Sequence, residues 1–341
     1  MHEEQQGQVQ YLWRERTFVK GYLVAIFLVL AKFIHNSHMV QGPLPVAPIA
    51  GSTPHFYAPG AYRVAIPALI KFLLRMHHFQ DPYWVLTFLD FVFGLLASYL
   101  LYKVVVAGFP LARTSIKERA LTVVLFLAFL QFAIPWVIPW QRPETLPSAL
   151  FIAAALFCLT KTGKGVVWTV ALLAAAAVQG FVRSDVSFAF GAALALASLM
   201  GDTLKESGSR WPNLLRGGGV VLISVAEQAY LQLVRFPHLT YEPGSEVMQF
   251  RNNLGFHNLS NCTIALLPYL VIGGLLIVKR VHMDAVDAVV AIASVVYFAM
   301  WFTVSSVDEV RIYVPFLMAL SVVAAKYMGQ CILRCQPADA G

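Results

Sequence analysis

Arginine and carboxylate side chains stand together in short polar segments that separate long apolar runs. Three segments hold such a pair, and in each the two members are two residues apart: Arg142 with Glu144, Arg183 with Asp185, and Glu309 with Arg311. A charged group at membrane depth is costly, so such groups pair with one another or bind a ligand. Local pairing at a helix end can explain each pair alone. Three similar pairs, together with Tyr62 and Arg63 from an earlier segment, predict one shared polar cavity.

The apolar runs are the elements that must position these pairs. A bilayer core about 30 Å thick requires roughly 20 apolar residues per helix, and fewer where the ends are anchored. The sequence supplies about ten such runs, at residues 18–34, 83–106, 120–140, 146–159, 166–182, 186–200, 220–233, 263–278, 286–304 and 312–328. We therefore predict an all-α fold, a polytopic transmembrane helix bundle that forms a single integral membrane domain over residues 1–341. The short runs 146–159 and 186–200 should pack inside the bundle or end at a water-filled recess.

The composition supports the same fold class. The chain has 58% hydrophobic and 13% charged residues, and its mean hydropathy is +0.67. So little polar surface does not cover a soluble globule of 341 residues, and lipid must be the solvent for most of the chain. The formal charge of +7 is spread over loops without a basic patch that interleaves aromatic residues, which argues against a nucleic-acid partner.

Lys and Arg concentrate in every second loop, a bias typical of the cytoplasmic loops of an inner-membrane protein. Arg14, Arg16 and Lys20 flank the start of the first run and should hold the amino terminus in the cytoplasm. Threading from there predicts short cytoplasmic termini at residues 1–17 and 329–341, with the three arginine and carboxylate segments outside. Residues 61–76 in the first outer loop show an apolar face interrupted by basic residues, which is the pattern of an interfacial or re-entrant helix.

Two further acids lie within apolar runs. Asp90 falls in the run 83–106, and Glu227 falls in the run 220–233. Intramembrane acids carry protons or ions in some membrane proteins and form hydrogen bonds between helices in others. The sequence leaves both roles open for these two acids.

Four short motifs carry a resemblance to a known family. They are Tyr62-Arg-Val-Ala-Ile-Pro67, Glu144-Thr-Leu-Pro147, Phe181-Val-Arg-Ser-Asp185 and Glu309-Val-Arg-Ile-Tyr-Val-Pro315. Together they resemble motifs of small bacterial multispan proteins related to the GT-C superfamily, the membrane glycosyltransferases that use polyprenyl-phosphate sugars. The similarity in layout covers most of the chain. It implies transfer of a sugar from a polyprenyl-phosphate-linked donor to an envelope acceptor on the extracytoplasmic face.

In such a transferase a carboxylate takes the proton of the acceptor hydroxyl, and arginines stabilise the charge that develops on the departing phosphate. The resemblance assigns phosphate or substrate binding to five residues: Tyr62, Arg63, Arg183, Glu309 and Arg311. GT-C enzymes typically carry a catalytic acid in the first outer loop, whereas here no Asp or Glu occurs between Asn36 and Gln80. Three acids remain as candidates for the base: Asp185, Glu144 and Asp81.

Two alternatives stay beside the transferase. One is a transporter or flippase for a lipid-linked or anionic substrate, which would bind with the same arginines and carry protons on Asp90 and Glu227. The other is a non-catalytic relative of the transferases. The expected partners are a polyprenyl-phosphate lipid donor and membrane lipid. The sequence assigns no metal ligands and leaves a divalent metal cofactor open.

Overall fold

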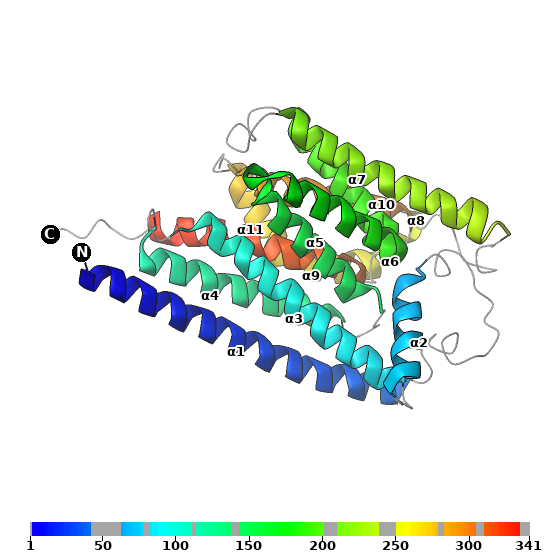
Figure 1. Ribbon diagram of the computed structural model, residues 1–341, viewed down its shortest axis with the longest axis horizontal. Coiled ribbons are helices and arrows are strands. Elements are labelled where there is room, and N and C mark those ends of the chain that lie inside the picture. The colour runs from blue at the N-terminus through cyan, green and yellow to red at the C-terminus, as the bar shows by residue number, and fades with distance from the viewer. Residues whose placement is uncertain are drawn as a thin grey trace.

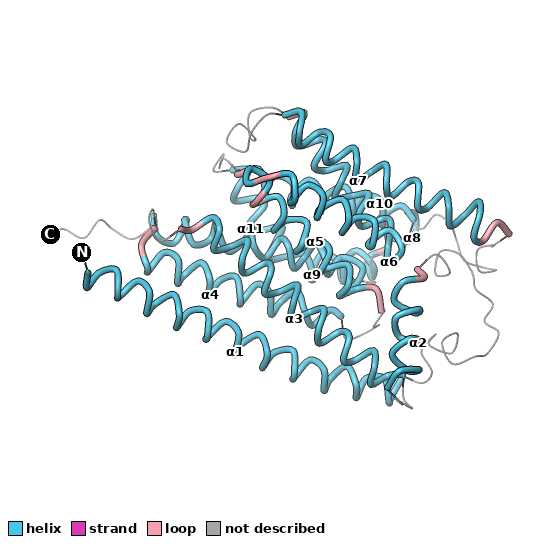
Figure 2. Tube along the Cα trace, viewed as in Figure 1, coloured by secondary structure: helices cyan, strands magenta, loops and turns pink. Residues whose placement is uncertain are grey.

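The computed structural model describes residues 2–41, 63–77, 82–110, 114–137, 143–200, 210–238, 250–278, 283–304 and 310–334, and its regular elements there are all helical. The α-helices are α1 (His2–Gln41), α2 (Ala65–His77), α3 (Pro82–Gly108), α4 (Ile116–Ala133), α5 (Thr145–Leu159), α6 (Val166–Leu199), α7 (Arg210–Tyr230), α8 (Phe250–Asn253), α9 (Phe256–Val278), α10 (Ala285–Val304) and α11 (Val314–Arg334). Short 3₁₀ turns form η2 (Ile134–Val137), η3 (Thr162–Lys164) and η6 (Val310–Tyr313), and a π-helical turn forms η5 (Leu231–Arg235). Figures 1 and 2 show most of the long helices running side by side as a bundle.

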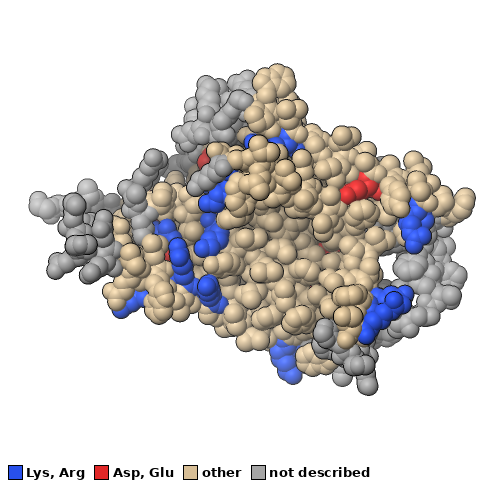
Figure 3. Space-filling view, in the orientation of Figure 1, with Lys and Arg blue, Asp and Glu red and all other residues tan. Residues whose placement is uncertain are grey.

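Seven described segments are long and apolar enough to cross a membrane: Trp84–Gly108, Ile116–Val137, Val166–Leu199, Trp211–Arg235, Phe256–Leu275, Ala285–Val304 and Val310–Leu333. Large apolar side chains face outward along them, among them Val167, Leu222, Leu267 and Val295. Such surface is unfavourable in water and is well solvated by lipid chains. In Figure 3 uncharged side chains form most of the visible face, and Lys and Arg gather mainly toward its two ends. These features indicate a membrane-embedded helical protein.

The α6 segment is a helical hairpin, because its chain reverses at Arg183. This residue has extended backbone angles, φ −162° and ψ 97°, between two helical halves. Three contacts with α7 reveal the reversal: Thr169 with Arg216, Ser187 with Ser224, and Gly191 with Gly217. In an unbroken helix residues 169 and 191 would lie about 33 Å apart. Here both contact the same turn of α7, so the predicted runs 166–182 and 186–200 are the two halves of one hairpin.

The centre of the bundle is formed by α5 and α11. Helix α5 packs against α3, α6 and α11, and most of its side chains are buried. With 15 residues it is too short for a perpendicular crossing of about 30 Å at 1.5 Å per residue. The interior position predicted from its length is confirmed.

Several helix ends differ from the predicted runs. Helix α1 begins at His2, so most of the predicted cytoplasmic terminus 1–17 is helical. Helix α7 begins at Arg210 and α9 at Phe256, ahead of the predicted residues 220 and 263. Hydropathy alone does not reveal these starts because they contain polar side chains. Those side chains are accommodated because they have partners in the fold. Arg216, for example, donates to Thr169 and to Asn213 at 2.9 and 2.6 Å.

The start of α1 and the end of α11 lie at the same end of the bundle (Figure 1). A buried network near this end links α1, α3 and α4. Arg119 donates to both carboxylate oxygens of Glu15 at 2.7 and 2.8 Å, and the Tyr102 hydroxyl donates to Oε1 of the same carboxylate at 2.5 Å. Burial would raise the pKa of Glu15, but the hydrogen bonds from Arg119 and Tyr102 hold it below its usual value.

A second network near this end involves Lys326, which is buried on α11 next to Gly108 of α3. Its ammonium group donates to Asp284 and Asp287 at 2.8 and 2.9 Å. Burial would raise the pKa of Asp284, yet the charge of Lys326 keeps it below its usual value. The two networks involve five helices, α1, α3, α4, α10 and α11, at the end where both described chain ends lie.

Helix α2 crosses the opposite end of the bundle in Figure 1. Its Ile66 and Ile70 are buried in a small apolar cluster with Leu86 of α3 and Val182 of α6. The helix therefore covers the end of the bundle that holds the break in α6. The predicted segment 61–76 coincides with α2 from Ala65 onward.

Candidate functional site

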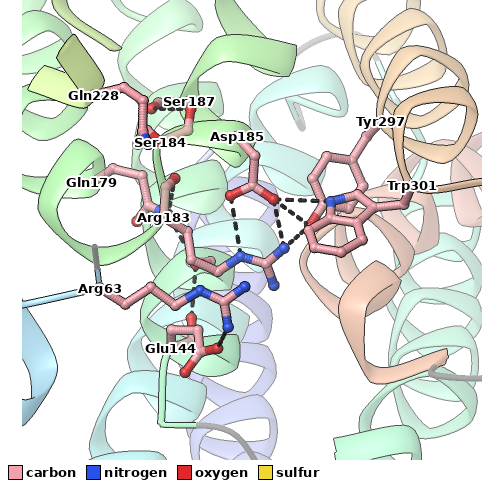
Figure 4. Close-up of polar contacts among 11 residues, drawn as sticks. Arg63, Glu144, Gln179, Arg183, Ser184, Asp185, Ser187, Gln228, Tyr297 and Trp301 are labelled. Atoms are coloured by element: carbon pink, nitrogen blue, oxygen red, sulfur yellow. Dashed lines mark hydrogen bonds and ion pairs between the residues drawn. The ribbon is translucent and has the colours of Figure 1, made fainter. Parts of the chain in front are cut away.

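The break in α6 positions Arg183 and Asp185 against α10 (Figure 4). Arg183 donates from Nε and Nη2 to the two oxygens of Asp185 at 3.2 and 2.6 Å. Asp185 also accepts from Trp301 Nε1 at 2.9 Å and from the Tyr297 hydroxyl at 3.3 Å. Arg183 Nη2 donates to the Tyr297 hydroxyl as well. Asp185 therefore accepts four hydrogen bonds, and the guanidinium group is fixed in direction.

The backbone at the break is supported by side chains from two helices. The Gln179 side-chain amide donates to the Arg183 carbonyl at 3.1 Å and to Ser148 Oγ at 2.9 Å. Ser148 Oγ donates in turn to the Glu144 carbonyl at 2.7 Å. A helix break frees backbone groups that need partners when buried, and Gln179 supplies one. This chain of bonds joins the break in α6 to the start of α5.

The second ion pair joins Glu144 and Arg63. Glu144 occupies the N-cap position of α5, where the helix dipole stabilises a negative charge, and it is 4% exposed. Arg63 lies two residues before α2 and donates from Nη1 to Glu144 Oε1. The two residues are 81 positions apart, so the tertiary fold creates this pair. Arg142, the neighbour that sequence spacing suggests for Glu144, lies outside the described residues.

The two ion pairs belong to one cluster. The charge of Arg63 acts on Asp185 and Tyr297, and the charge of Glu144 acts on Arg183. Figure 4 shows both arginines extending into one region between α5, α6 and α10. The structure thus brings together four of the residues singled out from the sequence, contributed by three separate stretches of the chain.

The remaining predicted site residues have different outcomes. Arg311 is buried in η6, and Tyr313 of the same turn packs edge-on against Tyr297 with ring centroids 6.2 Å apart. Tyr62, Asp81 and Glu309 lie outside the described residues. The turn that carries Arg311 therefore contacts Tyr297 of the cluster through Tyr313.

Sequence reasoning missed Gln179, Tyr297 and Trp301. All three lie in apolar runs, where their hydrophobic neighbours hide them. One signal was available: Tyr297 and Trp301 are four residues apart, which places both polar tips on one helix face. Gln179 likewise precedes Arg183 by four residues on the first half of α6.

Among the residues that the structure describes, no group of three or more His, Cys, Asp or Glu side chains is arranged to hold a metal ion. Comparison of the chain with known protein families, curated proteins and solved structures finds no match.

Proposed function

We propose that the chain is an inner-membrane glycosyltransferase-like protein that transfers a sugar from a polyprenyl-phosphate-linked donor to an envelope acceptor on the extracytoplasmic face. The observation that carries the proposal is the pair of arginines, each bonded to an acid, at one end of a membrane-embedded bundle. Burial of charged groups in a membrane-embedded protein costs free energy, and binding of a ligand gives the cluster a function that accounts for this cost.

Both arginines keep hydrogen-bond donors that the described residues do not use. Arg183 bonds through Nε and Nη2, which leaves Nη1. Arg63 bonds through Nη1, which leaves Nε and Nη2. Guanidinium groups remain charged and match the geometry of phosphate oxygens. Arg63 and Arg183 would hold the phosphate of the lipid donor, with Tyr62, Glu309 and Arg311 as further substrate contacts.

The bonding of the two described acids favours different roles for them. Asp185 accepts four hydrogen bonds, about as many as a carboxylate can accept, which leaves little room for a bond from an acceptor hydroxyl. We assign it the role of positioning Arg183. Glu144 is then the proposed base, with Arg63 keeping it ionised until it accepts the proton of the acceptor hydroxyl. Asp81 stays a reserve candidate.

The proposed topology has ten crossings with both termini in the cytoplasm. It counts the two halves of α6 separately and adds α1 and α5 to the other candidate spans. The Arg63 and Arg183 cluster then lies on the extracytoplasmic side, opposite the described chain ends. Helix α2 would lie at the interface over this cluster, or re-enter the membrane beside it.

The runner-up is a transporter or flippase for a lipid-linked or anionic substrate. A specific observation favours it: Asp90 Oδ2 and Glu227 Oε2 are buried and have no hydrogen-bond partner among the residues that the structure describes. Groups of this kind carry protons in pumps and transporters. A transporter would depend on these two acids, whereas a transferase would depend on the outer cluster alone.

The test is release of polyprenyl phosphate from a polyprenyl-phosphate sugar by the purified protein in lipid nanodiscs, with a panel of envelope acceptors. Wild type should release it, and Glu144→Gln should be slower by about 10² to 10⁴ because general-base catalysis is lost. Arg235→Gln, at an exposed arginine outside the cluster, is the matched control and should match wild type.

No release by wild type with any donor would overturn the transferase proposal. Native rates in Glu144→Gln would exclude Glu144 as the base. A separate assay with the protein in liposomes tests the transporter. Movement of lipid across the liposome membrane that is lost in Asp90→Asn and Glu227→Gln would support it.

A further inference from the structure

Asp90 is an acid whose bonding the transferase mechanism leaves unexplained. It lies on α3, is 1% exposed, and has a carboxylate oxygen, Oδ2, without a hydrogen-bond partner among the described residues. Thr87, one helical turn away on the same face, is also buried, and its hydroxyl likewise has no partner among the residues that the structure describes. Buried polar atoms in proteins nearly always have partners, so these two mark a place where something small binds.

The charges around Asp90 decide what binds there. A charge that acts on Asp90 is that of Glu144, which is negative and is bonded to Arg63. An ionised Asp90 would be a second carboxylate beside Glu144, unbonded and removed from water. Burial of an unpaired charge is strongly disfavoured, whereas a protonated carboxyl is neutral. A proton is therefore the occupant that fits best.

The other charged groups on helices packed against α3 do not replace that proton. On α2, Lys71 and Arg75 are exposed, as is Lys32 on α1. The remaining buried charges on its neighbours lie at the far end of the bundle: Glu15, Arg119 and Lys326. Glu15 is bonded to Arg119 and Tyr102, and Lys326 is bonded to Asp284 and Asp287. Among the described residues, Glu144 is thus the charged group that acts on Asp90.

We propose that Asp90 is a proton-binding site coupled to the phosphate site: its protonated form permits an anionic phosphate to bind at Arg63 and Arg183, and its ionised form opposes binding. The proposal rests on the phosphate site proposed above. An ionised Asp90 adds a second negative charge beside Glu144 and so weakens the attraction of the cluster for an anionic phosphate. Because coupling between two sites is reciprocal, phosphate binding also favours proton uptake by Asp90.

The coupling predicts a pH dependence that one substitution should remove. Asp90→Asn keeps the shape of the side chain and is neutral at every pH. The ratio of the wild-type dissociation constant to that of Asp90→Asn should be near one at low pH. Above the pH at which Asp90 ionises, it should grow by up to tenfold per pH unit, because one proton is linked to binding. Taking the ratio cancels the ionisation of the phosphate itself.

The experiment measures binding of farnesyl phosphate, and separately of inorganic phosphate, by calorimetry from about pH 5 to about pH 9. Ser98→Ala is the matched control, since Ser98 is another buried unpartnered hydroxyl on the same helix, more than two turns from Asp90. It should follow wild type. A rising ratio with both ligands assigns the site to phosphate in general, and one with farnesyl phosphate alone assigns it to a lipid headgroup.

A constant ratio across the pH range would overturn the coupling while leaving the phosphate site intact. Absence of binding by wild type and Asp90→Asn alike would overturn the phosphate site and the coupling with it. Infrared spectroscopy of the ligand-free protein gives an independent check. The C=O band of a protonated carboxyl should be present at neutral pH in wild type and in Ser98→Ala, and its Asp90 component should be missing in Asp90→Asn. No loss of band intensity in Asp90→Asn would show that Asp90 is ionised and would refute the proposal.

Discussion

Replacement of Asp185 by Asn should destabilise the protein, because it leaves the charge of Arg183 buried without its bonded counter-charge. The Arg183 side chain is 2% exposed. Removal of one partner from a buried ion pair lowers the free energy of unfolding by roughly 3–5 kcal/mol. Glu144 still acts on Arg183 in the variant, so we expect a loss near the lower end, about 3 kcal/mol.

The matched control is Asp284→Asn, at the other end of the bundle. Asp284 also bonds a buried cation, Lys326, but Lys326 keeps Asp287 as a second partner. The Asp284 side chain is 47% exposed, so its pairing is largely screened by solvent. Its replacement should lower the free energy of unfolding by less than about 1 kcal/mol.

The assay is unfolding by sodium dodecyl sulfate in mixed micelles, followed by circular dichroism. A double variant that adds Arg183→Met to Asp185→Asn removes the buried charge as well, and it should regain most of the lost stability. A loss below about 1 kcal/mol in Asp185→Asn, or a double variant less stable than the single one, would refute the inference that Arg183 is a buried charge neutralised by Asp185.

Three further predictions follow from the described contacts. The lowered pKa of Glu15 means that its pairing stabilises the fold above the unfolded pKa near 4.5, and that this contribution is lost as pH falls through the folded pKa. Glu15→Gln should therefore weaken the fall in the free energy of unfolding with decreasing pH. An unchanged pH dependence would contradict a stabilising role for the Glu15 pairing. Tyr297→Phe should cost about 1 kcal/mol in the same detergent titration, because it removes a hydroxyl bonded to Arg183 and Asp185, and a neutral effect would contradict the bonding described. Single cysteines at Thr162 and His257, in a cysteine-free background, should react with impermeant reagents from opposite sides of the membrane, and same-side labelling would contradict the proposed topology.

Hydropathy in the sequence was sufficient to predict an all-helical, membrane-embedded chain, because lipid imposes long apolar runs on every span. It also located the interruption between residues 182 and 186, where Arg183 and Asp185 stand between two apolar stretches. It could not predict how far α1 and α7 extend. Their first turns are polar, and bonds such as Arg216 to Thr169 become visible only when the helices are packed.

The site was predictable in part for the same reason. Short spacing suggested Arg183 with Asp185, and the structure has that pair. The bond from Arg63 to Glu144 depends on the placement of α2 against α5 and leaves no local pattern in the sequence. Tyr297 and Trp301 were hidden as well, since a tyrosine or tryptophan in an apolar run has the composition expected of a lipid-facing or core residue.

The central claim, that Arg63 and Arg183 bind the phosphate of a polyprenyl lipid, is tested most directly by native mass spectrometry of the protein purified from membranes. Wild type and Arg235→Gln should each retain a polyprenyl-phosphate species. The double variant Arg63→Lys with Arg183→Lys should lose that species while keeping its phospholipids, because Lys preserves the charge but not the planar pairing geometry. Wild-type protein that carries phospholipid alone, or a double variant that retains the polyprenyl phosphate at the wild-type level, would contradict the claim.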